Sequence, residues 1–219
     1  MNIVILYTTV KESLHRIIEE KIALFPLDFQ NEIRNYANWA DAQKSVLGRL
    51  LLQEGMNRIG RTFNQHEVFY NNFKKPILKS NDVKFNISHS GELVVCALTK
   101  HGNIGVDVEK IRYINWEELK SQMTNNEIAI IATSKNKEEA FFNYWTKKEA
   151  VLKAHGKGLL VDLPSFEVIN NKAEIEACHY FTKEVYLKTG YKSHLAINSN
   201  FDGLSIDIHE IDLVKIANC

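Results

Sequence analysis

Apolar residues recur along this chain with two spacings, one typical of strands and one typical of helices. Short apolar or alternating runs predict strands at residues 2–7, 67–70, 83–87, 93–98, 104–108, 166–169, 184–187, 194–198 and 204–210. A spacing of three and four residues predicts helices at residues 11–23, 28–36, 41–58 and 137–155. Residues 111–135 fit a helical connection that packs on the core. The pattern therefore predicts a chain that mixes helices and strands.

Turn residues set the expected connections between these elements. Residues 100–103 separate two apolar runs by a few polar residues and a glycine, which predicts a hairpin between strands 93–98 and 104–108. Residues 88–91 are expected to form a turn after strand 83–87. Gly156 and Gly158 are expected to end the helix at 137–155, because glycine commonly follows a helix C-terminus.

Two acidic residues lie two positions apart in the apolar strand at 104–108. Side chains at i and i+2 of a strand point to the same face. Asp107 and Glu109 therefore project together, whereas Ile104, Val106 and Val108 face a core. A solvated strand face would have the same pattern, so this pair alone does not establish a site.

A third carboxylate stands on the helix predicted at 137–155. Glu149 and Lys153 are four residues apart and share one helix face. Placed beside Asp107 and Glu109, the Glu149 carboxylate would complete an all-oxygen site for a hard cation such as Mg²⁺, and Lys153 would contact the phosphates of a substrate. The simpler alternative is an ion pair on the helix surface.

Composition narrows the class of protein. The 219 residues are 45% hydrophobic and 25% charged, as in an ordinary globular protein. The 27 basic and 27 acidic residues give a net charge of zero, which argues against a general nucleic-acid or membrane-surface binder. Three scattered cysteines predict neither a disulfide framework nor a metal cluster. With no signal-peptide or membrane-span pattern, a cytoplasmic location is expected.

Several segments together resemble the motifs of the Sfp-type 4′-phosphopantetheinyl transferases. The matching residues are Lys75-Pro76, Asn86-Ile-Ser-His89-Ser, Ile104-Gly-Val-Asp107-Val-Glu109-Lys, Trp145-Thr-Lys-Lys-Glu149-Ala-Val-Leu-Lys153 and Gly156-Lys-Gly158. Their order and spacing fit the family, and the likeness extends from about residue 41 to the C-terminal region. A combination of motifs in the right order is far more specific than any one of them.

The resemblance implies an α+β fold of two similar halves, related by a pseudo-twofold axis and packed as one unit. The N-terminal half, residues 1–105, would hold the 3′-phosphate and adenine side of coenzyme A. The C-terminal half, residues 106–219, would hold the metal site and the region that faces the carrier protein. An echo between residues 204–211 and 104–111 hints at the same internal pair. Because one chain supplies both halves, a monomer is expected.

The implied activity is transfer of the 4′-phosphopantetheine arm of coenzyme A to a serine of an acyl- or peptidyl-carrier protein, with release of adenosine 3′,5′-bisphosphate. Asp107, Glu109 and Glu149 would hold Mg²⁺, and Lys153 would neutralise charge on the pyrophosphate. Either Glu149 or a metal-bound water would take the serine proton. Residues 111–135 would contribute an apolar surface to the carrier protein. The pathway of that carrier stays open.

On the coenzyme A side, the resemblance assigns contacts to Lys44, Lys75, Pro76, Ser88 and His89. The chain also departs from the family in two places.

Phe29 and Glu32 stand where further lysines are expected, which leaves Arg34 and Arg49 as the basic residues available on this side. Lys74 stands where a glycine usually precedes Lys-Pro, so we expect a turn of different shape that does not require positive φ.

Two other functions share part of these features. A Mg²⁺-dependent phosphohydrolase would use the same carboxylates with water as acceptor, and a coenzyme A sensor would need no metal.

Overall fold

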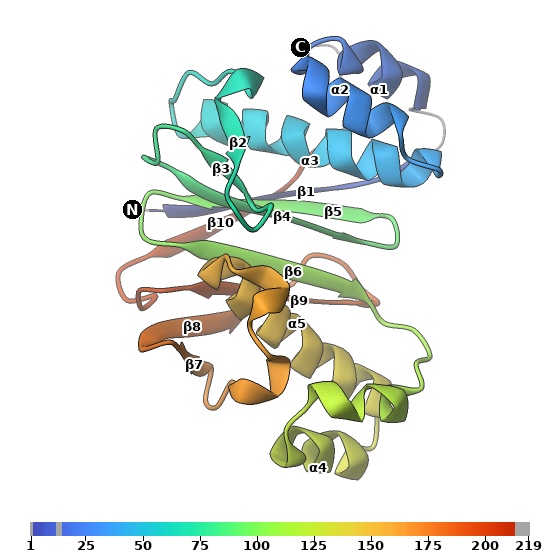
Figure 1. Cartoon of the computed structure of the whole chain (residues 1–219), viewed down its shortest axis with the longest axis vertical. Coiled ribbons are helices and arrows are strands. Elements are labelled where there is room, and N and C mark those ends of the chain that lie inside the picture. The colour runs from blue at the N-terminus through green and yellow to red at the C-terminus, as the bar shows by residue number, and fades with distance from the viewer. Residues whose placement is uncertain (1, 12–14, 213–219) are drawn as a thin grey trace.

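The computed structural model describes residues 2–11 and 15–212. Its strands form two four-stranded sheets, with the orders β10-β1-β5-β4 and β6-β9-β8-β7, and a small sheet of β2 and β3 (Figure 1). The strands are β1 (Asn2–Thr9), β2 (Val68–Tyr70), β3 (Pro76–Leu78), β4 (Lys84–Ser90), β5 (Leu93–Thr99), β6 (Ile104–Lys110), β7 (Lys172–Ile175), β8 (Cys178–Glu184), β9 (Tyr191–Ile197) and β10 (Ser205–Glu210).

Two long helices cover the outer faces of the two sheets. The helices are α1 (His15–Ile22), α2 (Leu27–Arg34), α3 (Trp39–Arg58), α4 (Asn125–Thr133) and α5 (Lys137–His155). The side chain of Asn38 caps α3 by accepting the N–H of Ala40 at 2.8 Å. Asn136 caps α5 in the same way, and Gly156 ends that helix at φ 88°, as expected. None of the described helices is long and apolar enough to cross a membrane.

The molecule is built in four layers, in the order α3, first sheet, second sheet, α5 (Figure 1). On β1, Val4 and Leu6 pack in the cluster under α3, whereas Ile3 and Ile5 pack between the two sheets. Strand β5 is divided in the same way and is buried throughout. Burial on both faces requires a nearly continuous apolar run, which is the pattern of residues 93–98.

The connectivity of one sheet repeats in the other, and the predicted α+β class with two similar halves is confirmed. In the first half β1 is followed by α3, and β1 lies beside β5, which lies beside β4. In the second half β6 is followed by α5, and β6 lies beside β9, which lies beside β8. The counterpart of β6 is therefore β1. Strand β10 returns to the first sheet and pairs with β1 in parallel, so the sequence echo at residues 204–211 does not mark the repeat.

The hairpin predicted between residues 93–98 and 104–108 is wrong. Both segments are strands, but β5 pairs with β1 and β4 in the first sheet, and β6 pairs with β9 in the second. Residues 100–103 carry the chain from one packed sheet to the other. A short polar turn between two apolar runs has the same sequence pattern in both topologies, because it fixes only the reversal of direction.

Other boundaries also differ from the sequence prediction. Residues 88–90 continue β4 instead of turning, because they pair with the start of β5. Residues 166–169 are not a strand, although Phe166 and Val168 pack under α5 as an apolar pattern requires. The hairpin that follows is β7 and β8, joined by Glu176 and Ala177 at φ 51° and 60°. Those two residues are unusual at positive φ, so the sequence did not signal the turn.

The strand predicted at residues 184–187 is wrong, because β8 ends at Glu184 and residues 185–187 are not strand. Val185 and Leu187 pack between the sheets, which explains the alternating apolar pattern.

The other predicted elements match the structure to within a few residues. Helix α3 covers the predicted range 41–58 and buries Val46, Leu47 and Leu51. Helix α1 begins at His15 in the described part of the chain, and residues 12–14 of the predicted helix lie outside it. The connection at residues 111–135 contains a 3₁₀ segment, η3 (Trp116–Gln122), and α4. Trp116, Met123 and Ile131 pack there in one cluster with α5.

Candidate active site

The acidic face of β6 lies against α5. Ile104, Val106 and Val108 point into the space between the sheets, as predicted from the alternation, so Gly105, Asp107 and Glu109 face the helix. Gly105 is the point of closest approach, because a Cβ atom there would lie 2.1 Å from the carbonyl oxygen of Ala150. The absence of a side chain at residue 105 lets the backbone of α5 pack directly on the strand.

Asp107 is 3% exposed, and within the described residues only one of its oxygens has hydrogen-bond partners. The Oδ1 atom accepts hydrogen bonds from the Lys153 ammonium at 2.6 Å and from the Ser88 hydroxyl at 2.9 Å. The Oδ2 atom is buried without a hydrogen-bond partner. A buried carboxylate oxygen of this kind is costly unless another donor or a cation satisfies it.

Glu109 and Glu149 lie close enough to Asp107 for the three charges to interact. Burial raises the pKa of Glu149, and the charges of Asp107 and Glu109 raise it further, against the lowering effect of Lys153. Burial also raises the pKa of Glu109, with Asp107 again adding to the rise and the Ser90 hydrogen bond opposing it. The structure thus brings together the three carboxylates predicted from β6 and α5.

This set of side chains has the chemistry that a hard cation requires. Carboxylate oxygens are the ligands that Mg²⁺ takes in proteins, and three negative groups in one buried place repel one another until a cation neutralises them. The unpartnered Asp107 Oδ2 is an oxygen that could ligate such a cation. As the side chains stand, with Lys153 paired to Asp107, no group of three or more His, Cys, Asp or Glu side chains in the described residues is arranged to hold a metal ion. The donor set fits a cation, although its present arrangement is not a finished metal site.

Basic side chains from the other half approach the same place. His89 lies on β4 and Lys44 on α3, where the Lys44 ammonium pairs with Asp41 at 2.7 Å. The pKa of His89 is lowered by burial first, and then by the charges of Lys44 and Lys153. His89 is therefore close enough to both Lys44 and Lys153 for their charges to affect its protonation. An anion bound beside them would lie between the two halves.

Lys75 joins the two halves through backbone carbonyls. Its ammonium donates to the carbonyl oxygens of Lys153 at 2.5 Å and Ile104 at 3.3 Å. Burial first, and then the charge of Lys84, lower the pKa of Lys75 to about 8. Pro76 follows at the start of β3. A coenzyme A contact through Lys75 or Pro76 stays a prediction.

The turn before Lys75 corrects one expectation. Lys74 adopts φ 61°, in the left-handed region, so the turn does require positive φ although a lysine stands there. The Asn71 side chain holds this turn by accepting the N–H groups of Phe73 and Lys75, each at 2.9 Å. These two bonds offset part of the strain at Lys74, and the turn does not need a different shape.

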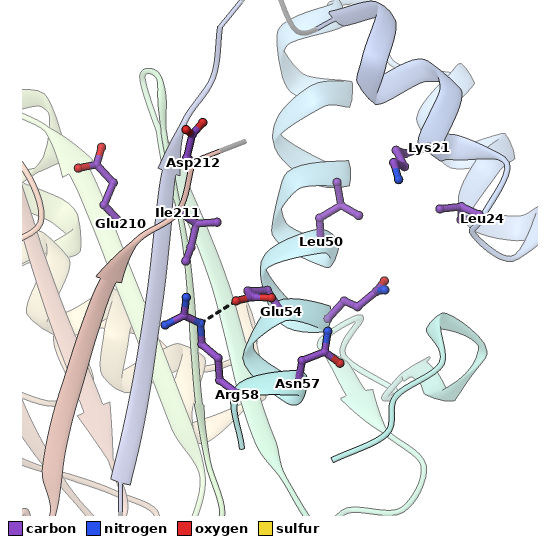
Figure 2. Close-up of a pocket in the computed structure, with 10 residues that line it drawn as sticks. Lys21, Leu24, Leu50, Glu54, Asn57, Arg58, Glu210, Ile211 and Asp212 are labelled. Atoms are coloured by element: carbon purple, nitrogen blue, oxygen red, sulfur yellow. Dashed lines mark hydrogen bonds and ion pairs between the residues drawn. The ribbon is translucent and has the colours of Figure 1, made fainter. Parts of the chain in front are cut away.

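A cavity of about 310 Å³ borders Glu149 and is lined by both halves. Phe73, Lys75 and Ile87 come from the first half, and Glu149 and Lys153 from α5. Another cavity, of about 340 Å³, lies between α1, α3 and the end of β10 (Figure 2). None of the predicted site residues lines that second cavity, where Arg58 pairs with Glu54 at 2.7 Å.

Ser88 is held by protein groups of the site, and its contact with coenzyme A stays a prediction. It is 5% exposed, and its hydroxyl accepts from Lys153 at 2.8 Å while it donates to Asp107. Ser90, which the sequence analysis did not single out, donates to Glu109 Oε2 at 2.5 Å. The small polar residues at alternate positions 86, 88 and 90 of this strand were a signal for such a buried polar face.

Arg49 lies beside Phe29, one of the two residues that stand where lysines were expected. Its guanidinium is buried 4.7 Å above the Phe29 ring, and burial lowers the pKa of Arg49. The Tyr70 hydroxyl beside it donates to Glu32 at 3.2 Å. Phe29 and Glu32 therefore belong to a packed group around Arg49.

Comparison with known proteins gives matches along most of the chain. Residues 103–210 match the family described as the 4′-phosphopantetheinyl transferase superfamily, and residues 14–101 match the one described as 4′-phosphopantetheinyl transferase, N-terminal. The chain is similar to the 4′-phosphopantetheinyl transferase gsp of Aneurinibacillus migulanus, with 34% identity over 187 residues that cover 81% of this chain and 78% of the relative.

A second relative is the 4′-phosphopantetheinyl transferase Sfp of Bacillus subtilis (strain 168). It is 31% identical over 144 residues, which cover 64% of this chain and 63% of the relative. Among solved structures, the crystal structure of Thermotoga maritima holo-[acyl-carrier-protein] synthase covers 43% of this chain and 61% of its own. Its TM-score of 0.34 and identity of 16% are too low to support an argument.

Proposed function

The chain belongs to the 4′-phosphopantetheinyl transferase superfamily, and on that basis we propose that it transfers the 4′-phosphopantetheine arm of coenzyme A to a serine of an acyl- or peptidyl-carrier protein. Adenosine 3′,5′-bisphosphate would leave. One observation supports the proposal beyond family membership: three mutually interacting carboxylates of the second half lie beside Lys153, whose charge also acts on His89 of the first half. Glu149 and Lys153 line a cavity that both halves share.

Charge complementarity supports the proposed donor. The pyrophosphate and 3′-phosphate of coenzyme A are anions, and Lys153, His89 and Lys44 present cationic or hydrogen-bonding groups to one side of the site. Asp107, Glu109 and Glu149 would hold Mg²⁺, whose contribution when bound is to neutralise charge on the pyrophosphate. The protein itself would mainly position the reacting groups and stabilise charge, as phosphate chemistry requires.

Lys153 has the role that is closest to the broken bond in this proposal. It lies one turn after Glu149 on α5, so its ammonium stays beside the carboxylates while it neutralises an oxygen of the leaving phosphate. Lys44 and His89 lie on the elements of the first half and would hold the more distant phosphate. The two groups therefore predict different kinetic effects when they are removed.

Glu149 is the proposed base for the serine proton. Its pKa is raised by burial and by the neighbouring carboxylates, and a base works best when its pKa approaches the working pH. Its carboxylate also lines the cavity that the pantetheine arm would enter. Removal of the carboxylate in Glu149→Gln tests this role together with the cation site.

The region that would face the carrier protein is the connection at residues 111–135. Tyr113 is 84% exposed and Ile130 on α4 is 66% exposed, so apolar side chains are available for a partner there. We also propose that one chain forms one complete site, since the residues named above come from both halves. Light scattering that shows an obligate oligomer would contradict the proposed monomer.

The experiment is incubation of apo-carrier proteins from fatty-acid, polyketide and peptide pathways with the protein, coenzyme A and Mg²⁺, followed by intact mass spectrometry. The expected result is a mass gain of one phosphopantetheine on the carrier serine, absent with Glu149→Gln. Release of free phosphopantetheine without any modified carrier would favour a phosphohydrolase. Binding of coenzyme A without turnover of any carrier would favour a sensor.

A further inference from the structure

In the described part of the chain, one edge of β6 is hydrogen-bonded by side chains instead of by another strand. The opposite edge pairs with β9 in the ordinary antiparallel way. On this edge β4 of the first sheet approaches, and its residues at alternate positions turn three polar side chains toward β6. They accept backbone N–H groups in register: Asn86 from Val106 at 2.9 Å, Ser88 from Val108 at 3.4 Å and Ser90 from Lys110 at 3.1 Å.

Two of these three side chains also hold the acidic residues of the site. Ser90 uses its one hydroxyl proton on Glu109 Oε2 at 2.5 Å and its lone pair on the N–H of Lys110. Ser88 donates in the same way to Asp107 Oδ1 at 2.9 Å. Asn86 has no such contact, because the residue at the corresponding place on β6 is Gly105. Each serine thus fixes a carboxylate relative to the backbone that bears it.

We propose that Ser90 and Ser88 are positioning residues, which orient Glu109 and Asp107 for a divalent cation. The affinity for that cation would then be set by β4, a strand of the opposite half, whose other face carries His89. The inference rests on the proposed function in one respect, that the carboxylates serve a cation. Ser90 is the better residue to test, since Ser88 also accepts from Lys153.

The expected effect is on cation affinity. Groups that orient a metal ligand typically contribute 10–100-fold to metal affinity when they are lost. Ser90→Ala removes both the hydrogen bond to Glu109 and the acceptor for Lys110. Asn86→Ala is the matched control, because it removes an acceptor for a β6 N–H group at a similarly buried position but touches no carboxylate. Ser90→Thr keeps the hydroxyl and is expected to retain affinity within about threefold of the wild type.

The experiment is a calorimetric titration of Mg²⁺, with Mn²⁺ followed by electron paramagnetic resonance, on the full chain without coenzyme A or carrier. Ser90→Ala is expected to weaken binding at least tenfold, and Asn86→Ala to leave it within about threefold of the wild type. Each alanine variant also loses one hydrogen bond between a β4 side chain and a β6 N–H group. Urea unfolding on the same samples measures what that loss costs in stability.

Two results would overturn the inference. One is wild-type cation affinity in Ser90→Ala. The other is a loss of cation affinity in Asn86→Ala as large as in Ser90→Ala, which would show that the contacts between β4 and β6 are merely structural. If Ser90→Ala does not fold, Ser90→Cys replaces it. In a protein that already carries Glu109→Gln, the change at Ser90 must not weaken cation binding any further. Modification of a carrier by the wild type is assayed in parallel. A wild type that modifies carriers while Ser90→Ala binds cation normally contradicts the inference and leaves the proposed function standing. A wild type that binds no divalent cation contradicts both.

Discussion

Gly105 allows a sharp test of how the site is assembled. An alanine Cβ at residue 105 would lie 2.1 Å from the carbonyl oxygen of Ala150, 2.4 Å from the amide nitrogen of Ala154 and 2.9 Å from the carbonyl carbon of Lys153. Ordinary contact begins at 3.4 Å, and all three atoms belong to the backbone of α5, which cannot rotate away. The change Gly105→Ala therefore forces strand and helix apart.

The expected loss has two parts. Overpacking of a well-packed core typically costs about 1–3 kcal/mol, and we expect at least the upper value because backbone atoms must move. Separation of β6 and α5 also moves Asp107 and Glu109 relative to Glu149 and Lys153, and a misplacement of about 1 Å can cost about 10²-fold in rate. Urea unfolding measures the first part, and carrier modification at saturating coenzyme A the second.

Gly48→Ala is the control for this experiment. Its Cβ would meet the Cγ2 atom of Ile87 at 2.7 Å, but that side chain borders a cavity and can turn toward it. Alanine also stabilises a helix interior by about 1 kcal/mol relative to glycine, so the net loss is expected to be small. Wild-type stability and turnover in Gly105→Ala would refute the close contact between α5 and β6. A loss in Gly48→Ala as large as that in Gly105→Ala would show that any added methyl has this effect.

Three other predictions concern single side chains. Lys153→Ala is expected to lower kcat with a smaller change in KM for coenzyme A. Lys44→Ala is expected to raise the KM for coenzyme A about tenfold, but not the KM for 3′-dephospho-coenzyme A. An equal rise of KM for both donors in Lys44→Ala would contradict its phosphate contact. Burial lowers the pKa of His194 to about 3 in the folded protein. As the pH falls from 6.5 to 3, the unfolded chain therefore takes up a proton that the folded one does not. The free energy of unfolding decreases by up to about 1.4 kcal/mol per pH unit in that range. His194→Gln should flatten this slope in unfolding measured against pH, and the exposed His179→Gln should not, so an unchanged slope in His194→Gln would show that the ring does not stay neutral. Lys74→Gly should stabilise the fold by about 1 kcal/mol, because glycine adopts φ 61° without strain, and an unchanged urea midpoint would contradict that strain.

Local sequence pattern was sufficient to predict which side chains share a face of one strand or one helix. Alternation along 104–109 places Asp107 and Glu109 on one face of β6, and the structure agrees. The four-residue spacing of Glu149 and Lys153 places both on one side of α5. The unbroken apolar run at 93–98 predicts a strand, and the structure has β5 there. These properties follow from fixed strand and helix geometry, so they need no knowledge of the neighbours.

The tertiary structure alone decided which elements are neighbours. The run at 93–98 and the run at 104–108 look like a hairpin, yet they belong to different sheets. No pattern within β4 says that the hydroxyl of Ser90 will donate to Glu109, or that the ammonium of Lys75 will donate to the carbonyl of Ile104. Such pairings depend on how all the layers share their apolar faces, and a strand with two apolar faces satisfies its local rules in several arrangements.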